Sequence, residues 1–235
     1  EQAIALNGDF TQALSNLGLL QCKQKNYTAA IEYCATVLRL RPDDAQACGQ
    51  LAIAYGAAED HDNALKYFQQ AIDLAPGNAA NHRQLADYYS TIKRYPLAVE
   101  AYRRTLELDS DDSETHNHMG VALQELEQYD AATGAYERAL ELEPKNISAL
   151  CNLGSTRQAQ KQLEHAKQTY LAALAIDPAF ERAYFALGNC YVLMNEPLLA
   201  LDCYHKTLEI NPDYRDAYVN ISATFSNIGR IEEAI

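Results

Sequence analysis

A 34-residue period is the feature of this sequence that most constrains its fold. Proline recurs at this interval or at twice its length, at Pro42, Pro76, Pro144, Pro178 and Pro212. Ser110 stands where the series lacks a proline. A second series, in the same register, is Ala30, Ala64, Ala98, Ala132, Ala166, Ala200 and Ala234. A fixed period of this length predicts one supersecondary unit repeated in series along the chain.

The repeated unit is clearest in residues 117–144, where two helical patterns flank a polar turn. In the second half, Ala132 and Tyr136 begin a series at the i, i+4, i+7, i+8 spacing of an amphipathic helix. The turn is expected at residues 127–130. Pro144 ends the second helix, because proline cannot continue an α-helix. Each unit is therefore predicted to contain two helices.

Small residues indicate how the two helices of a unit pack. One position of the first helix reads Gly18, Ala52, Ala86, Gly120, Gly154, Gly188 and Ser222. Small residues on facing helices let the two backbones approach closely, which predicts an antiparallel hairpin. A larger residue four positions after each alanine fills the remaining gap. These residues are Cys34, Phe68, Tyr102, Tyr136, Tyr170 and Tyr204.

The resulting pattern, Leu-Gly/Ala-x-x-Tyr followed by Ala-x-x-x-Tyr-x-x-Ala and proline, resembles the tetratricopeptide repeat family over the whole chain. The resemblance implies an all-α fold, a right-handed superhelical solenoid of antiparallel helix hairpins. It also implies that the first helices line a concave groove in which partners bind. The chain departs from the family pattern in having no tryptophan.

The register divides the chain into units of one predicted solenoid domain covering residues 1–235. Residues 1–10 are expected to be the end of a preceding repeat, and residues 215–235 a partial repeat. The complete repeats are predicted at 11–44, 45–78, 79–112, 113–146, 147–180 and 181–214. Because both ends cut a repeat, we expect a fragment of a longer protein with exposed apolar ends.

Charge and composition restrict the class of partner. The formal net charge of −13 argues against nucleic acids and anionic membranes, which need a cationic surface, and favours a neutral or basic protein or peptide. No apolar run reaches the length of a membrane span, and no basic-then-apolar leader is present, so we expect no membrane insertion. Six cysteines without a C-x-x-C pair indicate reduced thiols and a cytoplasmic location.

The predicted inner face carries a row of carboxamides. The position before the conserved leucine or methionine of each first helix reads Asn16, Gln50, Gln84, His118, Asn152, Ala186 and Asn220. A carboxamide has both a donor and an acceptor, so it can pair with the backbone of an extended peptide. The row is similar to the asparagine ladder in the repeat domain of the O-linked N-acetylglucosamine transferases. Further candidate binding residues nearby are Gln12, Gln46, Arg83, Asp87, Asn117 and Asn189. Alternatively, these polar residues only solvate the inner face.

No motif predicts catalysis, a cofactor or a metal. The sequence lacks a phosphate loop, a nucleophile elbow and a His-Glu-x-x-His pair. His82 with His116, or His118 with Cys151, supplies fewer than the three or four ligands that a metal site needs. The lysine and arginine set with which chaperone adaptors of this family grip a terminal carboxylate is also absent, which disfavours that partner.

The sequence therefore predicts a protein–protein interaction scaffold or adaptor, without catalytic residues, that binds an extended peptide or a partner helix in the concave groove. One alternative is a substrate-recruiting module of a larger enzyme, such as a glycosyltransferase, whose catalytic domain follows Ile235. Another is a scaffold that forms homo-oligomers by end-to-end stacking of its exposed repeat ends.

Overall fold

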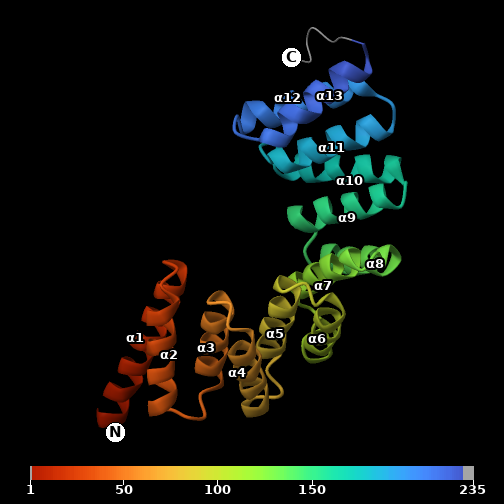
Figure 1. Cartoon of the computed structure of the whole chain (residues 1–235). Helices are drawn as coiled ribbons and strands as arrows, with labels where there is room; N and C mark the ends of the chain where they lie inside the picture. Colours follow the sequence, from red (N-terminus) through yellow and green to blue (C-terminus); the bar gives the residue numbers. More distant parts are fainter. Residues whose placement is uncertain (1, 230–235) are drawn as a thin grey trace. The chain divides into compact units, whose positions relative to one another are not determined.

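A computed structural model describes residues 2–229 of the chain, and Figure 1 shows their arrangement as a series of α-helices. Within these residues there are thirteen helices and no strand, which confirms the predicted all-α fold. The helices are α1 (Gln2–Lys23), α2 (Tyr27–Leu40), α3 (Ala45–Ala57), α4 (His61–Leu74), α5 (Ala79–Thr91), α6 (Tyr95–Leu108), α7 (Ser113–Glu125), α8 (Tyr129–Leu142), α9 (Ile147–Ala159), α10 (Leu163–Ile176), α11 (Glu181–Leu193), α12 (Pro197–Ile210) and α13 (Arg215–Asn227).

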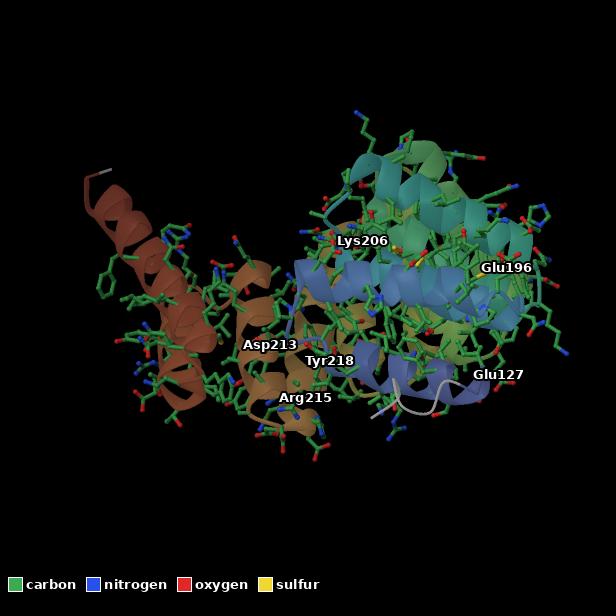
Figure 2. The ribbon with its side chains drawn as sticks, turned by 90° about the horizontal axis from the view of Figure 1, so that it is seen from above. Glu127, Glu196, Lys206, Asp213, Arg215 and Tyr218 are labelled. Carbon is green, nitrogen blue, oxygen red and sulfur yellow. The ribbon has the colours of Figure 1, made fainter. Side chains whose placement is uncertain are left out.

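Each complete repeat forms the predicted hairpin of two packed helices, from α1–α2 to α11–α12. The turns between them share one backbone conformation. A residue in the left-handed region follows each first helix, with φ between 57° and 62°, at Lys25, Glu59, Lys93, Glu127, Lys161 and Asn195. At Glu127, the N–H bonds to the Gln124 carbonyl while the Gln128 N–H bonds to the Leu123 carbonyl. This paired arrangement satisfies the last carbonyls of the helix. Figure 2 shows the exposed side chains of Glu127 and Glu196 projecting outward from these turns.

The alanine series forms the centre of the hairpins. All the described members, from Ala30 to Ala200, have 0% of their surface exposed, whereas Ala234 lies outside the described residues. The aromatic rings of the second helices lie against the small residues of the first helices. A Cβ added to Gly154 would lie 2.5 Å from Cε1 of Tyr170, so in this hairpin the ring occupies the space that a side chain would take. The predicted packing of small against aromatic residues is thus confirmed.

The six cysteines are free thiols, and four of them, Cys34, Cys48, Cys190 and Cys203, are buried. Burial raises the pKa of the Cys34 and Cys48 thiols to about 11, so both stay protonated at neutral pH. These side chains act as small apolar residues of the core, as the sequence indicates.

The first residues differ from the prediction. Residues 1–10 were expected to end a separate helix, but α1 runs without a break from Gln2 to Lys23. In the 34-residue register, Gly8 stands where later units have Pro42 and Pro76. Glycine weakens a helix but keeps its N–H donor and has no ring to clash with the preceding turn, so the helix continues.

The chain divides into two compact units between Asp111 and Asp112. In the first unit α2 packs against α3, and α4 against α5. In the second unit α8 packs against α9, α10 against α11, and α12 against α13. Among the described helices, none combines the length and the apolar character needed to cross a bilayer.

Replacing Ala132 with leucine should overpack the α7–α8 hairpin, because this position has no exposed surface. We expect a loss of about 1–3 kcal/mol in the free energy of unfolding. The matched control is Ala131→Leu, one residue away on the exposed face of α8, which should change stability by less than about 0.5 kcal/mol. Urea unfolding followed by circular dichroism measures both changes.

The two substitutions Gly154→Ala and Gly134→Ala should have opposite effects. At Gly154 the new methyl group meets the buried Tyr170 ring, whereas nothing lies within 4 Å of the corresponding atom at Gly134, on the surface of α8. We expect Gly154→Ala to destabilise the protein by about 1–3 kcal/mol. Gly134→Ala should stabilise it by about 0.5–1 kcal/mol, because alanine favours a helix interior. The same sign of change for both, measured by thermal unfolding, would contradict the packing described above.

Candidate functional site

In the first unit the predicted carboxamides lie on α1, α3 and α5, three helices that pack side by side. Asn16 on α1 is exposed and accepts a hydrogen bond of 3.2 Å from Gln12. Gln50 on α3 is only 8% exposed, and its buried Oε1 has no hydrogen-bond partner among the described residues. Gln84 on α5 lies over the α3 backbone, since a Cβ on Gly49 would lie 2.5 Å from its Oε1. The carboxamides of this unit therefore have different environments.

In the second unit the carboxamides link one first helix to the next. Asn152 Nδ2 on α9 donates to Asn117 Oδ1 on α7 over 3.1 Å. Asn220 Nδ2 on α13 donates to Asn189 Oδ1 on α11 over 2.8 Å. His118, also on α7, is half-buried. Each pair uses one donor and one acceptor, and each fixes the orientation of the carboxamide that donates.

The remaining predicted residues lie on the same first helices. Gln46 on α3 is exposed, whereas Arg83 and Asp87 are half-buried one turn apart on α5. Asp87 Oδ1 accepts a hydrogen bond of 2.7 Å from the hydroxyl of Tyr102. Asp87 is therefore held in place by a side chain from α6.

The tyrosine hydroxyls also contact the polar side chains of the first helices. The sequence did not predict these contacts, because the spacing assigns the rings to packing alone. Four second-helix tyrosines reach through their hairpin to a polar side chain on the first helix. The bonds are Tyr102 to Asp87 (2.7 Å), Tyr136 to Gln124 (3.4 Å), Tyr170 to Gln158 (3.5 Å) and Tyr204 to Asn189 (2.8 Å). The feature of the sequence that could have indicated these hydrogen bonds is a polar residue either 12 or 15 positions before each tyrosine.

Burial changes the acidity of these phenols. Burial raises the pKa of Tyr102 far above its usual range, and the nearby Asp87 carboxylate raises it further. Burial likewise raises the pKa of Tyr136 and Tyr170. These groups remain neutral hydrogen-bond donors at physiological pH.

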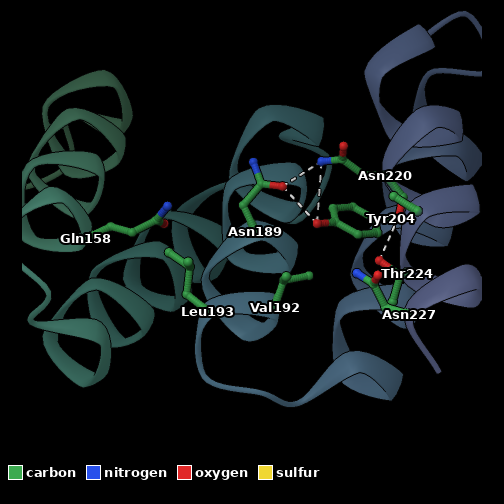
Figure 3. A pocket seen from close by; sticks show the side chains of 9 residues that line it. Gln158, Asn189, Val192, Leu193, Tyr204, Asn220, Thr224 and Asn227 are labelled. Carbon is green, nitrogen blue, oxygen red and sulfur yellow. Dashed lines mark hydrogen bonds between the residues drawn. The ribbon is translucent and has the colours of Figure 1, made fainter.

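Two hollows open between consecutive first helices. Hollow A, in the first unit, has a volume of about 300 Å³ and is lined by Ile53, Gly56, Ala57, Phe68, Gln84, Asp87, Tyr88 and Thr91. Hollow B, in the second unit, has a volume of about 330 Å³ and is lined by Gln158, Asn189, Val192, Leu193, Tyr204, Asn220, Ala223, Thr224 and Asn227 (Figure 3). Each residue that lines hollow A has an equivalent in hollow B, four repeats later in the chain; Asn189, for example, is the equivalent of Ile53. The hollows are the same site in two repeats.

The hollows contain four of the predicted binding residues, Gln84 and Asp87 in hollow A and Asn189 and Asn220 in hollow B. The other eight predicted residues line neither hollow. The residues at the helix ends, such as Thr91, Leu193 and Asn227, were not predicted, because the carboxamide row lies in the middle of each first helix. Within residues 2–229, no three histidine, cysteine or acidic side chains gather as metal ligands would.

Comparison with family models gives matches to tetratricopeptide repeats. The matched residues are 9–77, 51–111, 113–146, 181–214 and 135–168. A search of curated proteins finds no match.

Several solved structures are similar in fold. PilF of Pseudomonas aeruginosa has a TM-score of 0.76 and 15% identity, with 94% of this chain and 99% of PilF covered. YrrB, described as a TPR protein with an unusual peptide-binding site, has a TM-score of 0.63 and 21% identity, with 78% of this chain and 95% of YrrB covered. MamA has a TM-score of 0.64 and 23% identity, with 71% of this chain and 97% of MamA covered.

We predict that the buried tyrosines make the folded protein less stable at alkaline pH. Their pKa is raised in the folded state, so the folded protein binds more protons than the unfolded chain between the two pKa values. The contribution of these tyrosines to stability is therefore complete below their unfolded pKa of about 10 and falls as the pH rises above it, by up to about 1.4 kcal/mol per pH unit for each group. Tyr136→Phe should make this decrease less steep, because it removes one titrating group. Urea unfolding between pH 8 and pH 11 tests this, with the exposed Tyr218→Phe as control.

Proposed function

The chain belongs to the tetratricopeptide repeat family, and we propose that it is an adaptor that binds an extended peptide segment of a partner protein along its first helices. The observation that supports this most directly is the fixed orientation of Asn152 and Asn220. Each donates a hydrogen bond from its Nδ2 to a residue of the preceding first helix. No described residue donates a hydrogen bond to its Oδ1. An oriented, unused acceptor is suited to a backbone N–H of a bound peptide.

Several weak bonds must act together in this proposal. One hydrogen bond contributes about 0.5–1.5 kcal/mol net, so useful affinity requires several carboxamides and additional apolar contact. The hollows provide that contact beside Gln84 and Asn220. The peptide-binding site named in the description of the similar YrrB supports the same kind of ligand.

The charge of the chain favours a neutral or basic peptide. The formal net charge is −13, and Asp87 lines one of the hollows. Complementary charge accelerates association and disfavours acidic partners. Repeats of this family are typically non-catalytic interaction modules, and we propose the same role here, in the cytoplasm.

The test is a pull-down from native cell extract, read by mass spectrometry, with the triple variant Asn16→Ala, Gln84→Ala and Asn152→Ala. We expect proteins that bind the original chain to be lost, because the variant removes three carboxamides from the first helices. The matched control replaces Gln69, Gln168 and His205, which are exposed on second helices, with alanine. This control should retain the same proteins.

Stability must be measured in parallel, because Asn152→Ala leaves Asn117 without its hydrogen-bond donor. A folded triple variant that captures the same proteins as the original chain would rule out the carboxamide surface as the binding site.

A further inference from the structure

Hollow A lacks the polar floor of the hairpins that have a tyrosine at the position of Phe68. In those hairpins a tyrosine hydroxyl meets a polar residue 12 or 15 positions earlier in the chain. In α3–α4 the aromatic residue is Phe68, which has no hydroxyl, and the two earlier positions are Ile53 and Gly56. All three positions that could form the polar contact therefore hold residues without a polar side-chain group.

A second exchange of residues adds another ring to the same hollow. Tyr88 on α5 occupies a position where the first repeat has Leu20 and the other repeats have small residues, which are Ala54, Ala122, Thr156, Cys190 and Thr224. Its ring needs the space that Gly56 leaves, because a Cβ there would lie 2.6 Å from Tyr88 Cε2. At the position of Gly56 the other repeats have larger residues, which are Cys22, Ser90, Gln124, Gln158, Val192 and Ser226.

The two rings form a fixed apolar floor. The Phe68 and Tyr88 centroids lie 5.2 Å apart, and the Tyr88 hydroxyl is 2.7 Å from Nδ1 of His61 at the start of α4. Ile53 forms a wall and keeps 38% of its surface exposed. In hollow B, by contrast, an apolar group would cover the Tyr204 hydroxyl and the Asn189 carboxamide, which costs desolvation energy.

The surroundings of hollow A are predominantly acidic. Asp87 lines it, and the pKa of Tyr88 is raised by burial and, to a smaller extent, by the carboxylates of Asp60 and Asp62. Basic groups in this part of the chain include Arg83, one turn from Asp87 on α5, and the His61 ring. Asp87 in the lining, with Asp60 and Asp62 near Tyr88, favours a ligand that carries positive charge next to its apolar side chain.

We propose that hollow A is an anchor subsite, which takes one uncharged apolar side chain of the bound peptide, such as leucine, methionine or phenylalanine, next to a lysine or arginine. This inference rests on the proposed peptide-binding function and adds the chemical class of its ligand. The volume of about 300 Å³ suits one side chain and is at the lower end for ligand sites.

The test uses a set of synthetic nine-residue peptides with an alanine and serine background. The central residue is leucine, methionine, phenylalanine, asparagine or glutamate, and its neighbours are two lysines or two glutamates. Fluorescence anisotropy measures the dissociation constant of each peptide. We expect the lysine-flanked apolar peptides to bind about ten- to a hundredfold more tightly than the peptides with a central asparagine, from burial of one apolar side chain.

Two reciprocal variants separate hollow A from hollow B. Ile53→Asn with Phe68→Tyr gives hollow A the asparagine and tyrosine of hollow B, and should abolish the preference for an apolar centre. Asn189→Ile with Tyr204→Phe makes the opposite exchange in the second unit, and should retain that preference at hollow A. Ala57→Glu, which places a charge at an exposed position of hollow A, serves if the first variant does not fold.

The outcomes distinguish this inference from the function on which it rests. In one outcome, the peptides bind, the triple alanine variant binds them more weakly, and the exchange in hollow A leaves the preference for an apolar central residue unchanged. The anchor subsite is then wrong and the adaptor function stands. If no peptide of the set binds the original chain, the anchor subsite is wrong, and the pull-down with the triple alanine variant decides the adaptor function separately. Equal binding of lysine- and glutamate-flanked peptides would refute the predicted charge preference.

Discussion

The close approach of two helices at a small residue is the constraint on which the rest of this structure depends. Because Gly154 has no side chain, the Tyr170 ring can lie against the backbone of the first helix. This contact fixes the separation of the helices, and it also aims the tyrosine hydroxyl at the opposite surface of the hairpin. One packing rule thus positions both the core and the polar groups beside the candidate site.

Much of the fold follows from the sequence because the same rule repeats. A single repeat, read alone, leaves its helix limits uncertain, but seven copies in register place the turns and the alanine series. Prediction failed at the start of the chain, where Gly8 replaces proline and α1 continues. The period describes the average unit, and a local exception to the average depends on the backbone chemistry of one residue.

The candidate site was less predictable than the fold. The sequence placed Asn152 and Asn220 on first helices, but it could not show that their Nδ2 atoms are already used by Asn117 and Asn189. It also treated Tyr204 as packing, because the spacing between its hydroxyl and Asn189 is set by the geometry of the hairpin. Hydrogen bonds between helices depend on side-chain direction, which periodicity does not determine.

Departures from the average repeat are where recognition can be specific. In the proposed binding mode, a row of carboxamides pairs with the backbone of a peptide and would give affinity without selecting a side chain. Hollow A differs from hollow B at matched positions, with Ile53 and Phe68 in place of Asn189 and Tyr204. Because the two hollows occupy equivalent positions of the repeat, the proposed difference in what they accept follows from these exchanged side chains. Selectivity in such an array therefore resides in the residues that break the repeat.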